Sequence, residues 1–221
     1  DTDSMVVLAG TDGILLHASG DPQFLGRAER VALRPGATWS EQHRGTNAIC
    51  TALTDDRALV VHAQEHFLER NGFLTCAAAP IHASDGRLLG VLDVSGDHRG
   101  YHRHTLGLVR SAVRMIEHRL FDTRHDPRHW NGLRLRLHAQ PEGLGTVTEG
   151  LLAVREDGVL VGASVTALQL LCLQWSDLGA LRLEEVLVEP LHQLLEWCHR
   201  PPSVARVVHT VAGHTLWVKA E

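Results

Sequence analysis

The chain has 221 residues, of which 44% are apolar and 21% are charged. These values are ordinary for a folded globular protein and exclude a disordered tail, and the length is enough for one large or two small domains. The formal net charge is −5, and Lys219 is the only lysine. A domain that grips nucleic acid by its phosphates normally shows clustered Lys and Arg, so we expect no direct DNA binding by this chain.

The four cysteines lie far apart and lack the CxxC spacing of a metal site. This pattern favours a reduced protein of the cytoplasm. No apolar run approaches the roughly 20 residues that span a bilayer, and no signal peptide opens the sequence, so we expect no membrane association. Because the sequence begins at Asp1 without Met, we expect a fragment of a longer polypeptide or a trimmed form of one.

The first half predicts an antiparallel sheet with helices inserted between its strands. Residues 5–21 contain two apolar runs around Asp12-Gly13, a hairpin signal because Asp-Gly tolerates the positive φ of a tight turn. Patterning then predicts, in chain order, a short helix near 24–30, an amphipathic helix within 39–53, a strand at 58–63, a helix at 65–72 ended by Gly72, and two strands within 74–97 around Ser84-Asp85-Gly86.

A long helix is expected at residues 102–122, and it carries two apolar stripes. One stripe has the three-four spacing of a coiled coil and contains Leu106, Val109, Val113, Ile116 and Leu120. The other contains Leu108, Ala112 and Met115. One stripe could face the domain and the other a partner. We expect a signalling helix that forms a homodimer, with packing inside one chain as the alternative, because the seam lasts only about two heptads.

A second domain is expected after a polar, His-rich stretch at 124–130, where Pro127 breaks the helix. Its predicted strands lie at 133–139, on both sides of Asp157-Gly158 within 150–164, at 204–211 and at 214–220, and its predicted helices lie at 165–173 and 183–199. Two small α+β domains joined by a helix suit a sensor better than an enzyme with one cleft.

Four segments carry a family resemblance: "PGATWSEQHRGTNAICTAL" at 35–53, "EHFL" at 65–68, "LTCAAAPI" at 74–81 and "GRLLGVLDVSGD" at 86–97. In this order they resemble the sensory region of acetoin-catabolism-type activators, a subgroup of the sigma-54-dependent bacterial enhancer-binding proteins. The resemblance implies an α+β fold with a GAF-like antiparallel sheet flanked by helices at residues 1–123. Residues 150–173 resemble the PAS-like domain that follows in such regulators, which implies a smaller PAS-like α+β domain at 124–221.

The resemblance also implies a function. Relatives of this kind carry an AAA+ ATPase and a helix-turn-helix, but this sequence has no GxxxxGK[ST] phosphate loop and no basic recognition helix. We therefore expect a sensor fragment with no catalytic residues and no cofactor. It would bind a small effector, such as an acetoin-like ketone, an alcohol or a diol. The full-length protein would contact DNA and sigma-54 RNA polymerase through parts absent from this sequence.

Several side chains are candidates for the ligand pocket. Aromatic side chains supply apolar walls in such pockets, and here they are Trp39, Phe67 and Phe73. Asn47 and Thr51 could present an amide and a hydroxyl to an oxygen-bearing ligand. Each of these assignments has an alternative, which is core packing for the aromatic rings and hydrogen bonds to nearby backbone for Asn47 and Thr51.

Ionisable side chains complete the expected ligand site. Asp93 falls on an apolar strand face, where a carboxylate needs a structural partner or a ligand. His66 could orient a carbonyl or a hydroxyl, or could cap a helix instead. Cys50 and Cys76 are expected on facing elements as buried small side chains. The family usually has Gly at position 50, so the resemblance implies a smaller or more reactive pocket here.

Other functions stay open. The chain could be a ligand-free dimerisation module that controls the ATPase, a thiol-based redox sensor, or a GAF-type methionine sulfoxide reductase. The histidines do not predict a metal site, because no HExxH motif occurs and no cysteine or carboxylate cluster completes the groups His98, His102 and His104, or His125 and His129.

Overall fold

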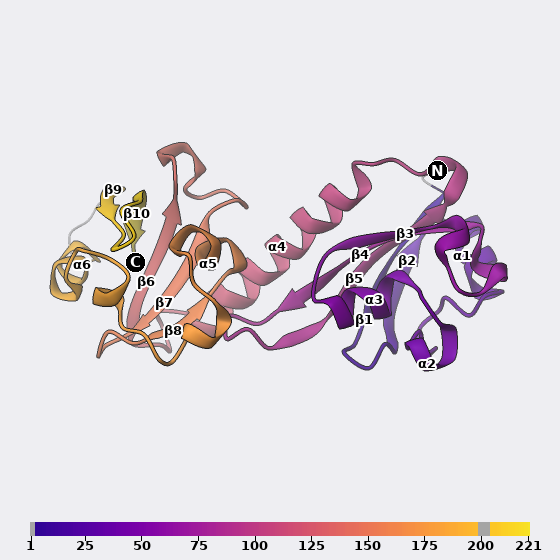
Figure 1. Cartoon of the computed structure of the whole chain (residues 1–221), viewed down its shortest axis with the longest axis horizontal. Helices are drawn as coiled ribbons and strands as arrows, with labels where there is room; N and C mark the ends of the chain where they lie inside the picture. Colours follow the sequence, from indigo (N-terminus) through magenta and orange to yellow (C-terminus); the bar gives the residue numbers. More distant parts are fainter. Residues whose placement is uncertain (1–2, 199–203) are drawn as a thin grey trace. The chain divides into compact units, whose positions relative to one another are not determined.

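The computed structural model describes residues 3–198 and 204–221. The chain forms two compact units, which Figure 1 shows with their elements labelled. The first unit is Asp1–His82 with Leu88–Val113, and the second is Ala83–Arg87 with Arg114–Glu221. The short connection at Ala83–Arg87, which follows a strand of the first sheet, therefore belongs to the second unit.

The first unit is a five-stranded antiparallel sheet in the order β2-β1-β5-β4-β3. Its strands are β1 (Ser4–Ala9), β2 (Leu15–Gly20), β3 (Leu59–His62), β4 (Leu74–His82) and β5 (Leu88–Asp97). Its helices are α1 (Pro22–Glu29), α2 (Glu41–Arg44) and α3 (Ala48–Asp55), with a 3₁₀ turn η3 at His98–Gly100. The predicted hairpin, the strands and the helix near 24–30 are confirmed. The helix expected within 39–53 is divided into α2 and α3, because Asn47 has extended backbone angles and caps the start of α3.

The helix predicted at 65–72 is wrong. The chain forms two single 3₁₀ turns there, η1 (Ala63–Glu65) and η2 (Glu69–Asn71). The Glu65 carboxylate accepts the backbone N–H of His62 at 2.7 Å, which closes η1 after one turn. His66 then has extended backbone angles and separates the two turns. The local side-chain bond thus competes with helix propagation.

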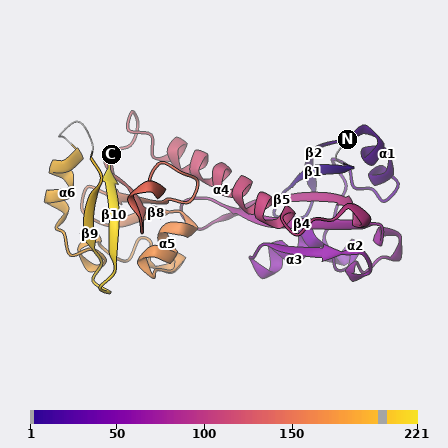
Figure 2. The ribbon, with the colours of Figure 1, turned by 90° about the horizontal axis from the view of Figure 1, so that it is seen from above.

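The two faces of the first sheet meet different helices, because side chains alternate along a strand. Leu74, Cys76 and Ala78 of β4 belong to the core that includes Ile49 and Ala52 of α3. We call this the α3 face. The intervening Thr75 and Ala77 line a hollow together with Leu108 of helix α4 (Thr105–Arg124). Figure 2 shows α3 and the first turns of α4 beside β4 and β5.

The long helix α4 runs from Thr105 to Arg124, two or three residues later than predicted at each end. Val109 and Val113 of the coiled-coil-like stripe are buried. Leu108 and Met115 of the second stripe are 66% and 64% exposed. The second stripe therefore offers the larger free apolar surface.

The second unit is also a five-stranded antiparallel sheet, in the order β8-β7-β6-β10-β9. Its strands are β6 (Gly132–His138), β7 (Gly150–Arg155), β8 (Leu160–Ala163), β9 (Arg206–His209) and β10 (Thr215–Ala220), and its helices are α5 (Val165–Leu171) and α6 (Leu191–Cys198). Three 3₁₀ turns complete it: η4 (Pro141–Gly143), η5 (Trp175–Asp177) and η6 (Leu183–Glu185).

The helix predicted at 183–199 is interrupted. Residues 183–185 form η6, and α6 begins only after Pro190. Proline lacks a backbone N–H and is favoured at helix starts rather than inside helices. Residue 199 lies outside the described residues. The expected α+β class is confirmed as two antiparallel sheets with helices.

Each sheet has a central strand with two strands on either side, but the central strands occupy different places in the order of the chain. In the first sheet the central strand β5 comes last in the chain, whereas in the second the central strand β6 comes first. The hairpins β1–β2 and β7–β8 occupy corresponding places beside that central strand. The assignment of the second unit as PAS-like, and the boundary between residues 123 and 124, stay predictions.

The connection Ala83–Arg87 is held in the second unit by hydrogen bonds. The carbonyl of Ser84 accepts the N–H of Ala163 at 2.7 Å, and Ser84 Oγ lies 3.0 Å from His125 Nε2. Burial lowers the pKa of His125 to about 4, so this imidazole is neutral near pH 7. The main core of the second unit is aliphatic and consists largely of leucine and valine.

Candidate ligand site

The amino terminus of α3 is fixed by Asn47, which is fully buried. Its Oδ1 accepts the N–H of Cys50 at 3.0 Å, as an N-cap does. Its Nδ2 donates to the carbonyl oxygens of Trp39 at 3.0 Å and Gly45 at 2.9 Å. These backbone contacts favour the structural alternative for Asn47 over a ligand contact.

The three aromatic side chains expected to line the pocket differ in their burial. Trp39 is buried in the core, where its Nε1–H donates to the carbonyl of Ala32 at 3.0 Å. Phe73 is half-buried, with the Arg27 guanidinium 5.1 Å from its ring centroid. Phe67 is 71% exposed. Thr51 is half-buried. These four side chains remain ligand contacts only by prediction.

The thiols of Cys50 and Cys76 are buried, and neither forms a disulfide. Cys50 lies in the first turn of α3, three residues after the cap, rather than in the middle of the helix. Burial raises the pKa of both thiols, and for Cys76 the nearby Asp93 raises the pKa further. A raised pKa disfavours the reactive thiolate, which weakens the redox and reductase alternatives.

Asp93 lies at the centre of the α3 face. It is fully buried on β5, opposite Val7 of β1 and Ala78 of β4. Its Oδ2 lies 2.6 Å from Ser95 Oγ, which is also 3.0 Å from Cys76 Sγ. The Ser95 hydroxyl carries one hydrogen and can donate to only one of them at a time. Burial raises the pKa of Asp93 to about 7, and its Oδ1 has no hydrogen-bond partner within the described residues.

The connection from β3 to β4 supplies two more buried polar side chains. Nδ1 of His66 lies 3.0 Å from the carbonyl oxygen of Ala63, whereas its Nε2 has no partner among the residues described. Asn71, at the end of η2, is fully buried. Neither the oxygen nor the nitrogen of its side-chain amide has a hydrogen-bond partner among the described residues. Burial lowers the pKa of His66.

His66, Asn71 and Asp93 thus share one property: each is at least nine-tenths buried and has a polar atom without a partner. Native proteins pair most buried polar groups, so each exception asks for an explanation. The sequence indicated Asp93 and His66 but not Asn71. Asn71 precedes Gly72 in what looked like a helix end, where an exposed turn residue is expected, and no pattern signals its burial.

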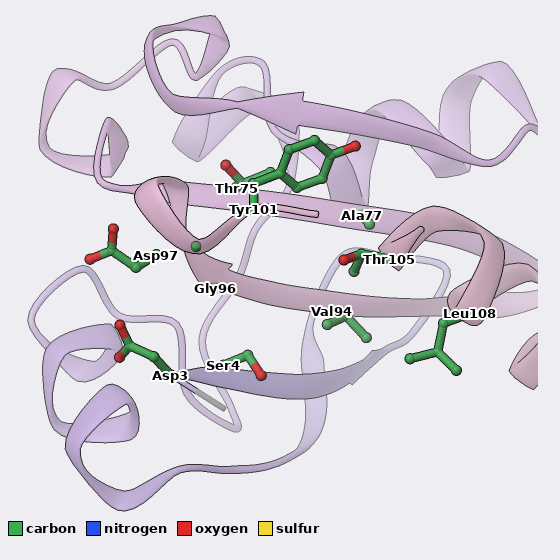
Figure 3. A pocket seen from close by; sticks show the side chains of 11 residues that line it. Asp3, Ser4, Thr75, Ala77, Val94, Gly96, Asp97, Tyr101, Thr105 and Leu108 are labelled. Carbon is green, nitrogen blue, oxygen red and sulfur yellow. The ribbon is translucent and has the colours of Figure 1, made fainter. Parts of the chain in front are cut away.

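A separate hollow of about 190 Å³ lies on the opposite face of the same sheet. Figure 3 shows Asp3 and Asp97 at one end of it and Leu108 at the other. The Asp97 carboxylate is already paired with the guanidinium groups of Arg99 and Arg27, and hydrogen bonds from Arg99 hold its pKa well below the usual range. This hollow therefore lacks an unpartnered charged anchor of the kind found on the α3 face.

The histidine groups are not assembled into a metal centre. The rings of His102 and His104 lie 4.7 Å apart, and His98 Nδ1 lies 3.3 Å from the carbonyl of Phe73. Within residues 3–198 and 204–221, no three His, Cys, Asp or Glu side chains form a group that could hold a metal ion. In that same part of the chain, no helix has the length and apolar character needed to cross a membrane.

Comparison with known families decides the assignment of the first unit. The GAF domain family matches residues 2–120, which is more than half of the chain. The chain belongs to the GAF domain family. The α3 face described above is thus the face of the GAF sheet that packs against α3.

The relatives with this GAF domain include transcriptional activators, which confirms the resemblance to acetoin-type regulators. The acetoin dehydrogenase operon transcriptional activator AcoR of Bacillus subtilis is 37% identical over 120 residues, which cover 54% of this chain and 20% of that protein. The acetoin catabolism regulatory protein of Cupriavidus necator is 32% identical over 158 residues, covering 72% and 24%. The propane 2-monooxygenase operon transcriptional activator MimR of Mycolicibacterium smegmatis is 34% identical over 122 residues, covering 54% and 21%.

The chain therefore spans about a fifth to a quarter of the length of these relatives. Among solved structures, a chain in the crystal structure of the E.coli DhaR(N)-DhaL complex is similar to this one, with a TM-score of 0.53 and 17% identity over 99% of this chain and 79% of the other. At this identity the likeness concerns the fold.

The buried carboxyl predicts a pH dependence of stability. The pKa of Asp93 is raised from 3.8 to about 7 in the folded state, so the folded state binds more protons in this window and loses stability as pH rises through it. Asp93→Asn removes this loss, which amounts to up to about 4 kcal/mol over the full window. Urea unfolding should show that the free energy of unfolding of the variant, relative to that of the wild type, is higher at pH 8 than at pH 5. Parallel pH profiles for the two proteins would contradict the buried carboxyl, and Asp55→Asn, at an exposed position, is the control.

Proposed function

We propose that this chain is the signal-sensing part of a bacterial transcriptional activator and that its GAF domain binds a small metabolite on the α3 face. The observation that carries this proposal is the set of unpartnered buried polar atoms on His66, Asn71 and Asp93. Leaving such a group buried and unpaired costs about 1–3 kcal/mol. A ligand that supplies the missing hydrogen bonds recovers that free energy.

The composition around these groups suits a small, partly apolar ligand. The core on the α3 face is otherwise apolar and includes Val7, Ile49 and Ala78. Small-molecule sites are mostly apolar with a few placed polar groups. The names of the relatives support a small carbon compound, because two of them concern acetoin and one concerns propane oxidation. An acetoin-like ketone, an alcohol or a diol is the proposed ligand class.

The remaining parts of the proposal follow the relatives. The PAS-like second unit and α4 would carry the ligand state onward to an ATPase and DNA-binding part outside this sequence. A ligand can shift such an equilibrium only by its differential affinity for two arrangements. The whole protein would act in the cytoplasm with sigma-54 RNA polymerase and DNA as partners.

A binding screen tests the ligand proposal. Calorimetry and thermal-shift measurements with small alcohols, ketones and diols should find a ligand that raises the free energy of unfolding, by about 2.7 kcal/mol at one hundred times its dissociation constant. His66→Phe and Asn71→Leu should each abolish or strongly weaken that binding. Leu16→Ala, at a 59% exposed position of β2, should leave it unchanged. If well-folded protein binds none of these compounds, the proposal fails.

A dimerisation module is the second candidate, and the exposed stripe of α4 favours it. Leu108 and Met115 lie seven residues apart on the helix and are both largely exposed, and solvent-facing apolar stripes of this kind often mark association surfaces. Val109 and Val113 of the expected seam are buried, so they are not free for a partner.

Charge substitution distinguishes the two stripes of α4. Leu108→Glu with Met115→Glu should convert a dimer to a monomer in analytical ultracentrifugation, because charges would enter the apolar contact. Ile116→Lys tests the coiled-coil-like stripe in the same way, and exposed Arg119→Glu serves as the control. A mass that stays unchanged in all variants would rule out α4 as the dimer contact.

A further inference from the structure

The carboxy end of helix α3 is tied to the end of strand β4. Nε2 of His82, the last residue of β4, lies 2.7 Å from Oδ1 of Asp56, the residue that caps the end of α3. Asp56 has left-handed backbone angles, with φ at 50°, which stop the helix there. The His82 side chain is buried, whereas the Asp56 side chain is exposed. This pair links the position of α3 to that of His82.

The chain passes directly from His82 into the turn Ala83–Arg87, which belongs to the second unit. The register between β4 and β5 shifts between Ile81 and His82, just before this turn. Irregularities of this kind interrupt the ladder locally and bend a strand. The turn is therefore less strictly fixed by the first sheet than the end of a regular hairpin would be, and its own contacts hold it in place.

Ser84 anchors the turn within the second unit. Its carbonyl oxygen accepts the backbone N–H of Ala163 at 2.7 Å, and its Oγ lies 3.0 Å from Nε2 of His125. Ser84 and His125 are both buried. Because a buried polar group that loses its hydrogen bond is left unpaired at a cost in free energy, these bonds resist displacement of the turn.

The two residues after Ser84 also fit their surroundings closely. The Asp85 carboxylate pairs with the guanidinium of Arg124 at 2.6 Å. Gly86 has a positive φ of 84°, and a Cβ atom at this position would lie 2.7 Å from the ring of Trp175. A side chain at position 86 would therefore strain the turn and displace Trp175. The turn is thus closely packed within the second unit, starting one residue after His82.

We propose that the turn Ala83–Arg87 transmits the position of α3 to the second unit, through the pair of Asp56 with His82 and the hydrogen bonds of Ser84. The proposal deepens the proposed function and rests on it for its role in signalling, because α3 packs on the face assigned to the ligand. It adds a path that does not run through α4. Coupling between two sites is reciprocal, so a change at Asp56 alters the bonds of Ser84, and a change at Ser84 alters the end of α3.

Asp56→Gly tests this path from the first unit. Glycine adopts the positive φ of position 56 without strain, so α3 keeps its end while the pair with His82 is lost. The reporter is the amide of Ala163, which donates to the carbonyl of Ser84. Hydrogen exchange followed by NMR should show this amide exchanging about fivefold faster than in the wild type, as loss of one partly exposed ion pair allows. The amides of β10, in the same unit, should exchange as before.

Arg57→Ala is the matched control for this measurement. It breaks the exposed ion pair of Arg57 with Asp55, next to Asp56 in the chain, which involves no residue of β4. The exchange of the Ala163 amide should stay at the wild-type rate in this variant. An unchanged rate in Asp56→Gly would overturn the proposal. An equal increase across β10 would also overturn it, because it would indicate general destabilisation of the second unit.

Ser84→Ala tests the path from the second unit. The variant loses the hydrogen bond to His125, so amides in the last turn of α3 should exchange faster than in the wild type. Adding Asp56→Gly should increase the exchange of the Ala163 amide little beyond that of Ser84→Ala alone, because both changes act on one path. Fully additive effects would contradict the proposal. No ligand is added, so a negative result would leave the proposed ligand site standing, and a failed binding screen would leave the coupling standing.

Discussion

A carboxyl group without a cationic partner among the described residues lies at the centre of the first sheet, and the account of this protein depends on it. Asp93 is enclosed by Val7, Ala78 and the core beneath α3, with Ser95 as its one hydrogen-bond donor. Burial of such a group is unfavourable unless something pairs with it. A buried group whose pKa is perturbed in this way is a candidate functional group, and the ligand proposed for this face would pair with it.

Much of the fold was predictable from periodicity and turn residues. Asp12-Gly13 marked the first hairpin, the apolar alternation marked β4 and β5, and the resemblance marked the GAF domain. The prediction failed at residues 65–72, where Glu65 bonds back to His62 and ends the turn early. Composition alone does not distinguish that local competition from helix propagation.

The site was predictable only in part. A carboxylate on an apolar strand can be recognised in a sequence, so the sequence indicated Asp93. The sequence did not predict its hydrogen bond with Ser95 or the unpartnered Oδ1. For Asn47 the sequence left a ligand contact and hydrogen bonds to nearby backbone as alternatives, and its bonds to Cys50, Trp39 and Gly45 at the start of α3 favour the second. The sequence did not predict Asn71 as a site residue, because its burial depends on tertiary packing, which no local sequence pattern shows.

A high-resolution crystal structure of the protein soaked with a small alcohol, ketone or diol found in the binding screen tests the central claim most directly. The account predicts electron density for the ligand on the α3 face, with a polar atom of the ligand within hydrogen-bond distance, about 2.7–3.0 Å, of at least one of the unpartnered atoms of Asp93, His66 and Asn71. Ordered water molecules alone at these atoms, or a ligand bound only in the hollow on the opposite face, would contradict it.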